Sequence, residues 1–82
     1  MNTAITQLRA NLSALKMRKM NLDVQIGGHI NDAKTLLALA SIKPIDQIDL
    51  DGACAILCTA RDLKNERIKV MADIAAIERE LG

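Results

Sequence analysis

Apolar side chains recur at alternating intervals of three and four positions from Ile5 to Ala40. The positions between these two ends are Leu8, Leu12, Leu15, Lys19, Leu22, Ile26, His29, Ala33 and Leu36, of which only Lys19 and His29 are polar. Because an α-helix has about 3.6 residues per turn, residues at this spacing share one face and can pack against a second helix. The pattern predicts a long amphipathic helix over about residues 3–41.

The pair Gly27-Gly28 lies inside this predicted helix. Each glycine lowers helix stability by roughly 1 kcal/mol relative to alanine, and glycine pairs are a recognised cause of kinks. The apolar pattern keeps the same register before and after the pair, which favours a continuous or gently bent helix. A hinge is the alternative, and close packing of another helix would be a further use for two small residues.

The middle of the chain carries signals for a turn. Pro44 is the only proline, and it disfavours helical geometry at the residue before it. Asp46 and Asp49 follow, and either side chain can cap the start of a helix. These residues predict a turn at about 42–49, followed by a second helix at about 50–81. That helix has the same alternating pattern, formed by Ala53, Ile56, Ala60, Leu63, Arg67, Val70, Ile74, Ile77 and Leu81.

A short turn between two long helices predicts that they lie antiparallel. The expected fold is therefore all-α: a single domain, residues 1–82, formed by two long amphipathic helices in a coiled-coil-like antiparallel hairpin. Residues whose numbers sum to about 91 should then face each other. This register predicts Lys19 near Asp73 and His29 near Asp62.

Both helices carry more apolar residues than one partner helix can cover. The second helix has a further apolar stripe, formed by Leu50, Leu57, Ile68, Met71 and Ala75, and the first has an outer patch formed by Met17, Met20 and Val24. The opposite face of the second helix is charged and is expected to be solvated. It is formed by Asp62, Glu66, Lys69, Asp73 and Glu80. Large exposed apolar patches are unusual on monomers. We therefore expect a homodimer, with two hairpins paired into a four-helix bundle.

The composition offers little chemistry for catalysis. Cys54 and Cys58 are the only cysteines, and the base rate for this residue type predicts buried packing rather than metal binding. His29 is the only histidine; it occupies a position of the apolar pattern and is expected to donate a hydrogen bond to a backbone or carboxylate neighbour. We predict no enzyme activity, no cofactor and no metal site. The unpaired cysteines and the lack of an apolar run long enough to span a membrane favour a cytoplasmic location.

Charge is unevenly distributed although the formal net charge is only +1. Residues 1–22 hold four basic side chains and no acidic one. The candidate partner-binding residues are the basic Arg9, Lys16 and Arg18 and the apolar Met17, Met20 and Val24. The predicted function is a protein–protein interaction module that acts as an adaptor, co-chaperone or inhibitor of a partner protein. The alternative is a small basic helical protein that binds nucleic acid or blocks a nucleic-acid-processing complex, as phage anti-defence inhibitors do; the lack of aromatic residues to stack on bases weighs against it.

Overall fold

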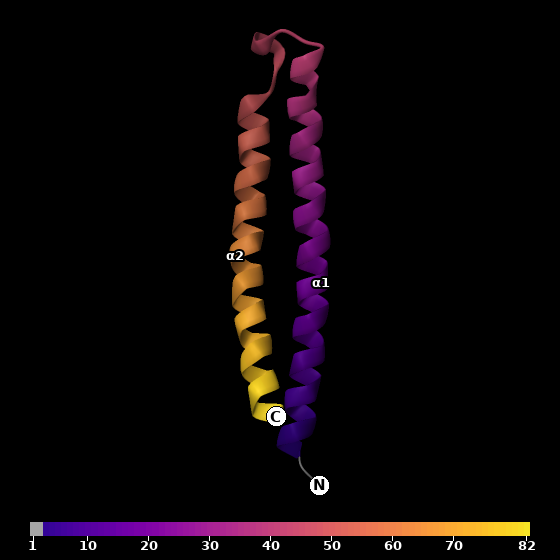
Figure 1. Cartoon of the computed structure of the whole chain (residues 1–82), viewed down its shortest axis with the longest axis vertical. Helices are drawn as coiled ribbons and strands as arrows, with labels where there is room; N and C mark the ends of the chain where they lie inside the picture. Colours follow the sequence, from indigo (N-terminus) through magenta and orange to yellow (C-terminus); the bar gives the residue numbers. More distant parts are fainter. Residues whose placement is uncertain (1–2) are drawn as a thin grey trace.

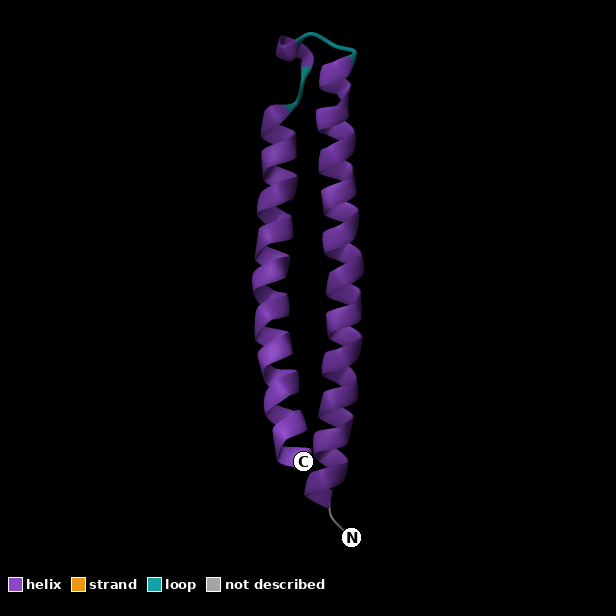
Figure 2. Ribbon diagram, viewed as in Figure 1, coloured by secondary structure: helices purple, strands orange, loops and turns teal. Residues whose placement is uncertain are grey.

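The computed structural model describes residues 3–82, which form two long helices lying side by side (Figure 1). Helix α1 spans Thr3–Ala38 and α2 spans Leu50–Leu81. Two short 3₁₀ helices lie between them, η1 at Leu39–Ser41 and η2 at Ile45–Gln47. The hairpin measures 67 × 15 × 14 Å, and no strand occurs in residues 3–82 (Figure 2). The predicted antiparallel helical hairpin is confirmed.

The two helices meet along the apolar positions that the sequence pattern predicts, and we call this line of contact the seam. Its buried residues are Leu22 and Ala33 from α1, with Ala53, Ala60, Val70 and Ile74 from α2. Near the middle of the hairpin, Leu22 packs with Val70 and Ile74 in a cluster that half-buried neighbours surround. Among residues 3–82, only Leu22 has no exposed surface at all. The hydrophobic stabilisation of this thin fold therefore depends on few residues.

Helix α1 passes through Gly27-Gly28 without interruption, as the constant register predicts. A Cβ atom added to either glycine would meet nothing within 4 Å. The use of this pair for close packing between α1 and α2 is therefore excluded, because both residues lie on the exposed surface of α1. The hairpin itself does not require glycine at these two positions.

The turn follows the signals in the sequence closely. The backbone N–H of Lys43 donates to the carbonyl of Leu39 at 2.9 Å, and Pro44 then takes an extended conformation with ψ of 151°. Of the two candidate caps, Asp49 is the one used, because its carboxylate accepts a hydrogen bond of 2.8 Å from the backbone N–H of Gly52. Gly52 leaves room for that carboxylate, since a Cβ there would overlap it.

Candidate interaction surfaces

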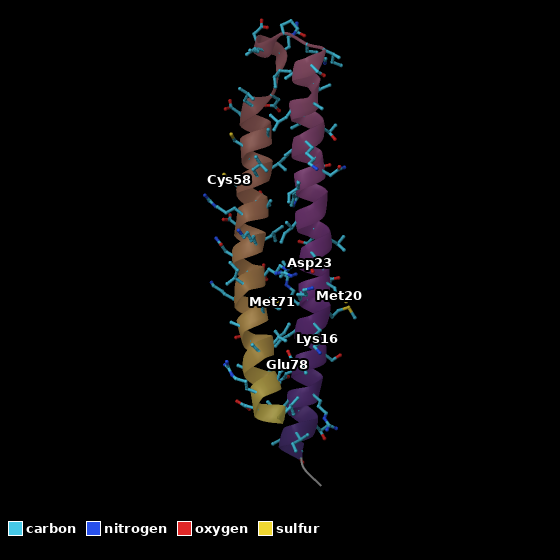
Figure 3. All side chains as sticks on the ribbon, viewed as in Figure 1. Lys16, Met20, Asp23, Cys58, Met71 and Glu78 are labelled. Atoms are coloured by element: carbon cyan, nitrogen blue, oxygen red, sulfur yellow. The ribbon has the colours of Figure 1, made fainter. Side chains whose placement is uncertain are left out.

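The seam divides the surface of the hairpin into two sides, and each carries a shallow groove. One groove, of about 380 Å³, is lined by Lys16, Lys19, Met20, Met71, Ile74 and Glu78. The other, of about 450 Å³, is lined by Asn11, Ala14, Leu15, Asp73, Ala76 and Ile77. We call these the Met71 side and the Asp73 side. Figure 3 places Lys16, Met71 and Glu78 in the half of the hairpin farthest from the turn.

The Met71 side is apolar toward the turn. Residues seven positions apart lie on the same side of a helix in a hairpin of this kind. Ile30 and Leu37 are two and three such steps from Lys16, and Leu57 and Leu50 are two and three steps from Met71. These four aliphatic side chains keep 42–53% of their surface exposed. We call them the turn-end cluster, and the hairpin alone does not cover it.

The Asp73 side is polar by the same seven-residue steps. In α1 and α2 it carries Asn11, Arg18, Gln25, Asp32, Thr59, Glu66, Asp73 and Glu80. Arg18 and Glu66 form an ion pair across the helices, with 2.5 Å between Nη2 and Oε1. Glu66 is therefore half-buried against α1, which corrects its predicted place on the solvated face of α2. None of the large exposed hydrophobic residues between positions 3 and 82 lies at these seven-residue steps.

Three charged residues meet between the helices below the turn-end cluster. The carboxylate of Asp23 forms ion pairs with two side chains. Nζ of Lys19 lies 2.9 Å from its Oδ2, and Nε of Arg67 lies 2.5 Å from its Oδ1. The hydrogen bond from Lys19, followed by that from Arg67, lowers the pKa of Asp23 below its ordinary value of 3.8. Asp23 projects toward α2 (Figure 3). Lys19 and Arg67 thus occupy seam positions and share one carboxylate as their ion-pair partner.

This arrangement corrects the expected pairing of Lys19 with Asp73. Lys19 lines the groove of the Met71 side, whereas Asp73 lines the opposite groove, so the seam separates them. Asp23 was not among the predicted contacts of Lys19. The signal that identifies it is the spacing of four residues between Lys19 and Asp23, which brings the two side chains together on one helix.

The outer face of α1 is exposed and almost uncharged. Its most exposed apolar residues are Met17, Met20 and Val24, at 59%, 60% and 75%. The other exposed residues of this face, from residue 10 to residue 38, are small or neutral, except Lys34: Ala10, Ser13, Ala14, Asn21, Gly27, Gly28, Asn31, Thr35 and Ala38. Charged residues normally dominate the solvent-facing side of an amphipathic helix. This composition is more typical of a helix face that packs against another protein.

The three basic candidate residues do not form one patch. Arg9 and Lys16 are exposed and seven positions apart on the Met71 side. Arg18 lies on the other side and is engaged by Glu66. The six candidate residues therefore divide between two sides and the outer face, with Met17 and Val24 on the face that carries the most exposed apolar surface.

Cysteine chemistry departs from the prediction. Cys54 and Cys58 are free thiols, and both are exposed rather than packed in the interior. The reason is that both fall outside the seam positions of α2, which are taken by Ala53, Ile56 and Ala60. Cys58 lies at the edge of α2 that faces away from α1 (Figure 3).

The ionisable residues that line the two grooves are Lys16, Lys19 and Glu78 on the Met71 side and Asp73 on the other side. Within residues 3–82 no cluster of three or more His, Cys, Asp or Glu residues is placed to hold a metal ion. His29 lies at the predicted seam position and is half-buried there. No helix in this range is long and apolar enough to cross a membrane. The chain matches no protein-family model, no curated protein and no solved structure.

Proposed function

We propose that this hairpin is a non-enzymatic protein–protein interaction module that works as a homodimer and acts as an adaptor, co-chaperone or inhibitor. The outer face of α1 is the contact surface for its partner protein. The observation that supports this proposal is the exposure of Met17, Met20 and Val24 on a helix face with almost no charge.

The glycine pair strengthens the case for this face. Gly27 and Gly28 weaken α1 by roughly 1 kcal/mol each relative to alanine, and they gain nothing from contact with α2. Small residues allow another backbone to approach a helix closely. Methionine is flexible and polarisable, and it adapts well to varied apolar surfaces. A helix or loop with an apolar stripe is the partner feature that this face fits.

Nucleic-acid binding is the second candidate, favoured by the exposed Arg9 and Lys16. Two of the four basic residues near the start of the chain are already paired, Arg18 with Glu66 and Lys19 with Asp23. Phosphate contacts depend on the number of available cations, and single-strand binding also uses stacking on aromatic rings. With no aromatic residue in the chain, this candidate ranks below a protein partner.

We place the protein in the cytoplasm. The support is chemical: exposed thiols at Cys54 and Cys58 stay reduced there, whereas an oxidising compartment promotes disulfides between such residues.

The experiment that tests the proposal is affinity capture of the tagged chain from its native cell, with and without nuclease treatment. We expect one defined protein in a fixed ratio, retained after nuclease and lost with the double variant Met17→Glu/Val24→Glu. Asn65→Glu, which adds a negative charge to an exposed position of α2, is the matched control and should retain it. A catch that disappears with nuclease and with reversal of Arg9, Lys16 and Arg18 to Glu would promote the nucleic-acid candidate instead.

A further inference from the structure

The turn-end cluster and the charges that continue along its side define a second surface, separate from the outer face of α1. We propose that a second copy of this chain covers the Met71 side, with the two turns side by side and α1 of each hairpin facing α2 of the other. This inference rests on the proposed function only in taking the homodimer as the working unit.

The first observation is the apolar content of this side. Ile30 and Leu37 from α1 lie beside Leu50 and Leu57 from α2, and each keeps 42–53% of its surface exposed after the hairpin has formed. The corresponding two and three steps from Asn11 and Asp73 on the other side hold Gln25, Asp32, Thr59 and Gly52, none of which has an aliphatic side chain. The asymmetry indicates that one side of the hairpin, and not the other, is built to be covered.

The second observation is charge complementarity between the two helices on this side. Starting from the end of the hairpin opposite the turn, the seven-residue steps of α1 on this side are Arg9, Lys16, Asp23, Ile30 and Leu37. Read in the same direction, α2 presents Glu78, Met71, Lys64, Leu57 and Leu50. When α1 lies antiparallel to α2 of a second copy, basic Arg9 faces acidic Glu78 and acidic Asp23 faces basic Lys64. Toward the turn, the aliphatic residues face one another.

Within the described part of one hairpin, the charges of Lys64 and Glu78 are unpaired, whereas that of Asp23 is already paired. Asp23 is bonded to Lys19 and Arg67 rather than to Lys64. Among the residues from 3 to 82, neither Lys64 nor Glu78 takes part in an ion pair. Both charges therefore remain available to a second copy. Complementary charges beside an apolar strip set the orientation and register of paired helices.

The same order of residues decides the relative direction of the two hairpins. Turning one copy end over end would place the aliphatic Ile30 and Leu37 against the charged half that holds Lys16 and Glu78. Desolvating those charges without partners is unfavourable. The arrangement with both turns at the same end avoids this, because apolar residues meet apolar residues and opposite charges meet.

A two-fold axis along the length of the hairpins generates this arrangement. Each α1 then has α2 of its own hairpin on one side of it and α2 of the second copy on another, and both are antiparallel to it. Met20 lines the groove of the Met71 side, but the rest of the outer face of α1, with Met17 and Val24, remains outside the four-helix contact. One pairing of hairpins therefore does not cover both apolar surfaces, and the face proposed for the partner protein stays accessible in the dimer.

Sedimentation equilibrium tests whether the Met71 side is the dimer surface. The native chain should have twice its monomer mass of 8.9 kDa at micromolar concentrations. The double variant Leu37→Glu/Leu57→Glu should be monomeric, with helical circular dichroism retained because both residues lie outside the buried core. Val24→Glu, on the outer face of α1, is the matched control and should remain dimeric. A native monomer, or a dimer broken by Val24→Glu and not by the double variant, would overturn the inference.

Spin labels test the direction without disturbing the surface. Asp46, in η2 at the turn, is changed to Cys in a Cys54→Ala/Cys58→Ala background and labelled. Paired helices pack about 8–10 Å apart, so the two labels of a turn-beside-turn dimer should be separated by roughly 30 Å or less. Separations approaching the 67 Å length of the hairpin would show the end-over-end arrangement and refute the proposal.

The two proposals fail in different ways. Val24→Glu is expected to lose the partner protein and keep the dimer, whereas Leu37→Glu/Leu57→Glu is expected to lose the dimer. A monomeric native chain that still captures its partner would remove this inference and leave the partner surface in place.

Discussion

Truncating the central core residue should destabilise the hairpin more than any other single apolar truncation. Leu22 is fully buried and packs against Val70 and Ile74, so the change Leu22→Ala removes contacts on all sides. Buried Leu→Ala changes cost about 3–5 kcal/mol, from lost burial plus the cavity that remains. Rigid long helices on both sides limit collapse into that cavity. We expect about 3 kcal/mol, which is a factor of about 160 in the folding equilibrium.

The measurement is urea unfolding followed by circular dichroism, with native and variant chains at the same concentration because dimerisation contributes to stability. Met17→Ala is the matched control, since it truncates a large side chain that is 59% exposed. The control should change the free energy of unfolding by less than about 0.5 kcal/mol. If Leu22→Ala cost less than about 1 kcal/mol, the seam would not be the main source of stability and the register described above would be wrong.

Three further predictions follow from the surface of the hairpin. Gly27→Ala and Gly28→Ala should each stabilise α1 by roughly 1 kcal/mol in thermal unfolding, because the added methyl group meets no atom; a loss of stability would contradict the straight, open helix. Because Lys19 and Arg67 lower the pKa of Asp23, its contribution to stability is present above the ordinary pKa of 3.8 and is lost as the pH falls through the lower folded value. An Asp23→Asn variant should therefore be less stable at neutral pH and lose less stability on acidification; parallel pH profiles would exclude this role. Cys54 and Cys58 should react with a thiol reagent in the folded chain as fast as in urea, and slow reaction of either thiol would show that it is covered.

The periodicity of the sequence predicts most of the fold. Every seam position from Leu8 to Leu36 and from Ala53 to Leu81 is buried or half-buried, because helical geometry converts spacing directly into a shared face. The choice between Asp46 and Asp49 as cap required the structure. Both residues are aspartates with the same capping tendency, so the outcome depends on which backbone N–H each side chain can reach.

The sides of the hairpin were harder to predict than its seam. Cys54 and Cys58 follow the general tendency of cysteine to be buried, yet helix phase places them outside the seam, and phase is the stronger constraint. Lys19 pairs with Asp23 four residues further along the same helix, whereas the predicted register relates only residues on opposite helices. The candidate residues Met17, Met20 and Val24 were identified correctly as exposed, but the sequence did not separate their face from the side that carries the turn-end cluster.

Photo-crosslinking in the native cell tests the central claim most directly, namely that the outer face of α1 contacts a partner protein. A photoreactive amino acid replaces Val24, which is 75% exposed, and in a second strain it replaces Asn65 on the exposed face of α2. We expect one discrete crosslinked protein band from position 24 that resists nuclease, and no such band from position 65. No crosslink at position 24, or a crosslinked species that nuclease removes, would contradict it.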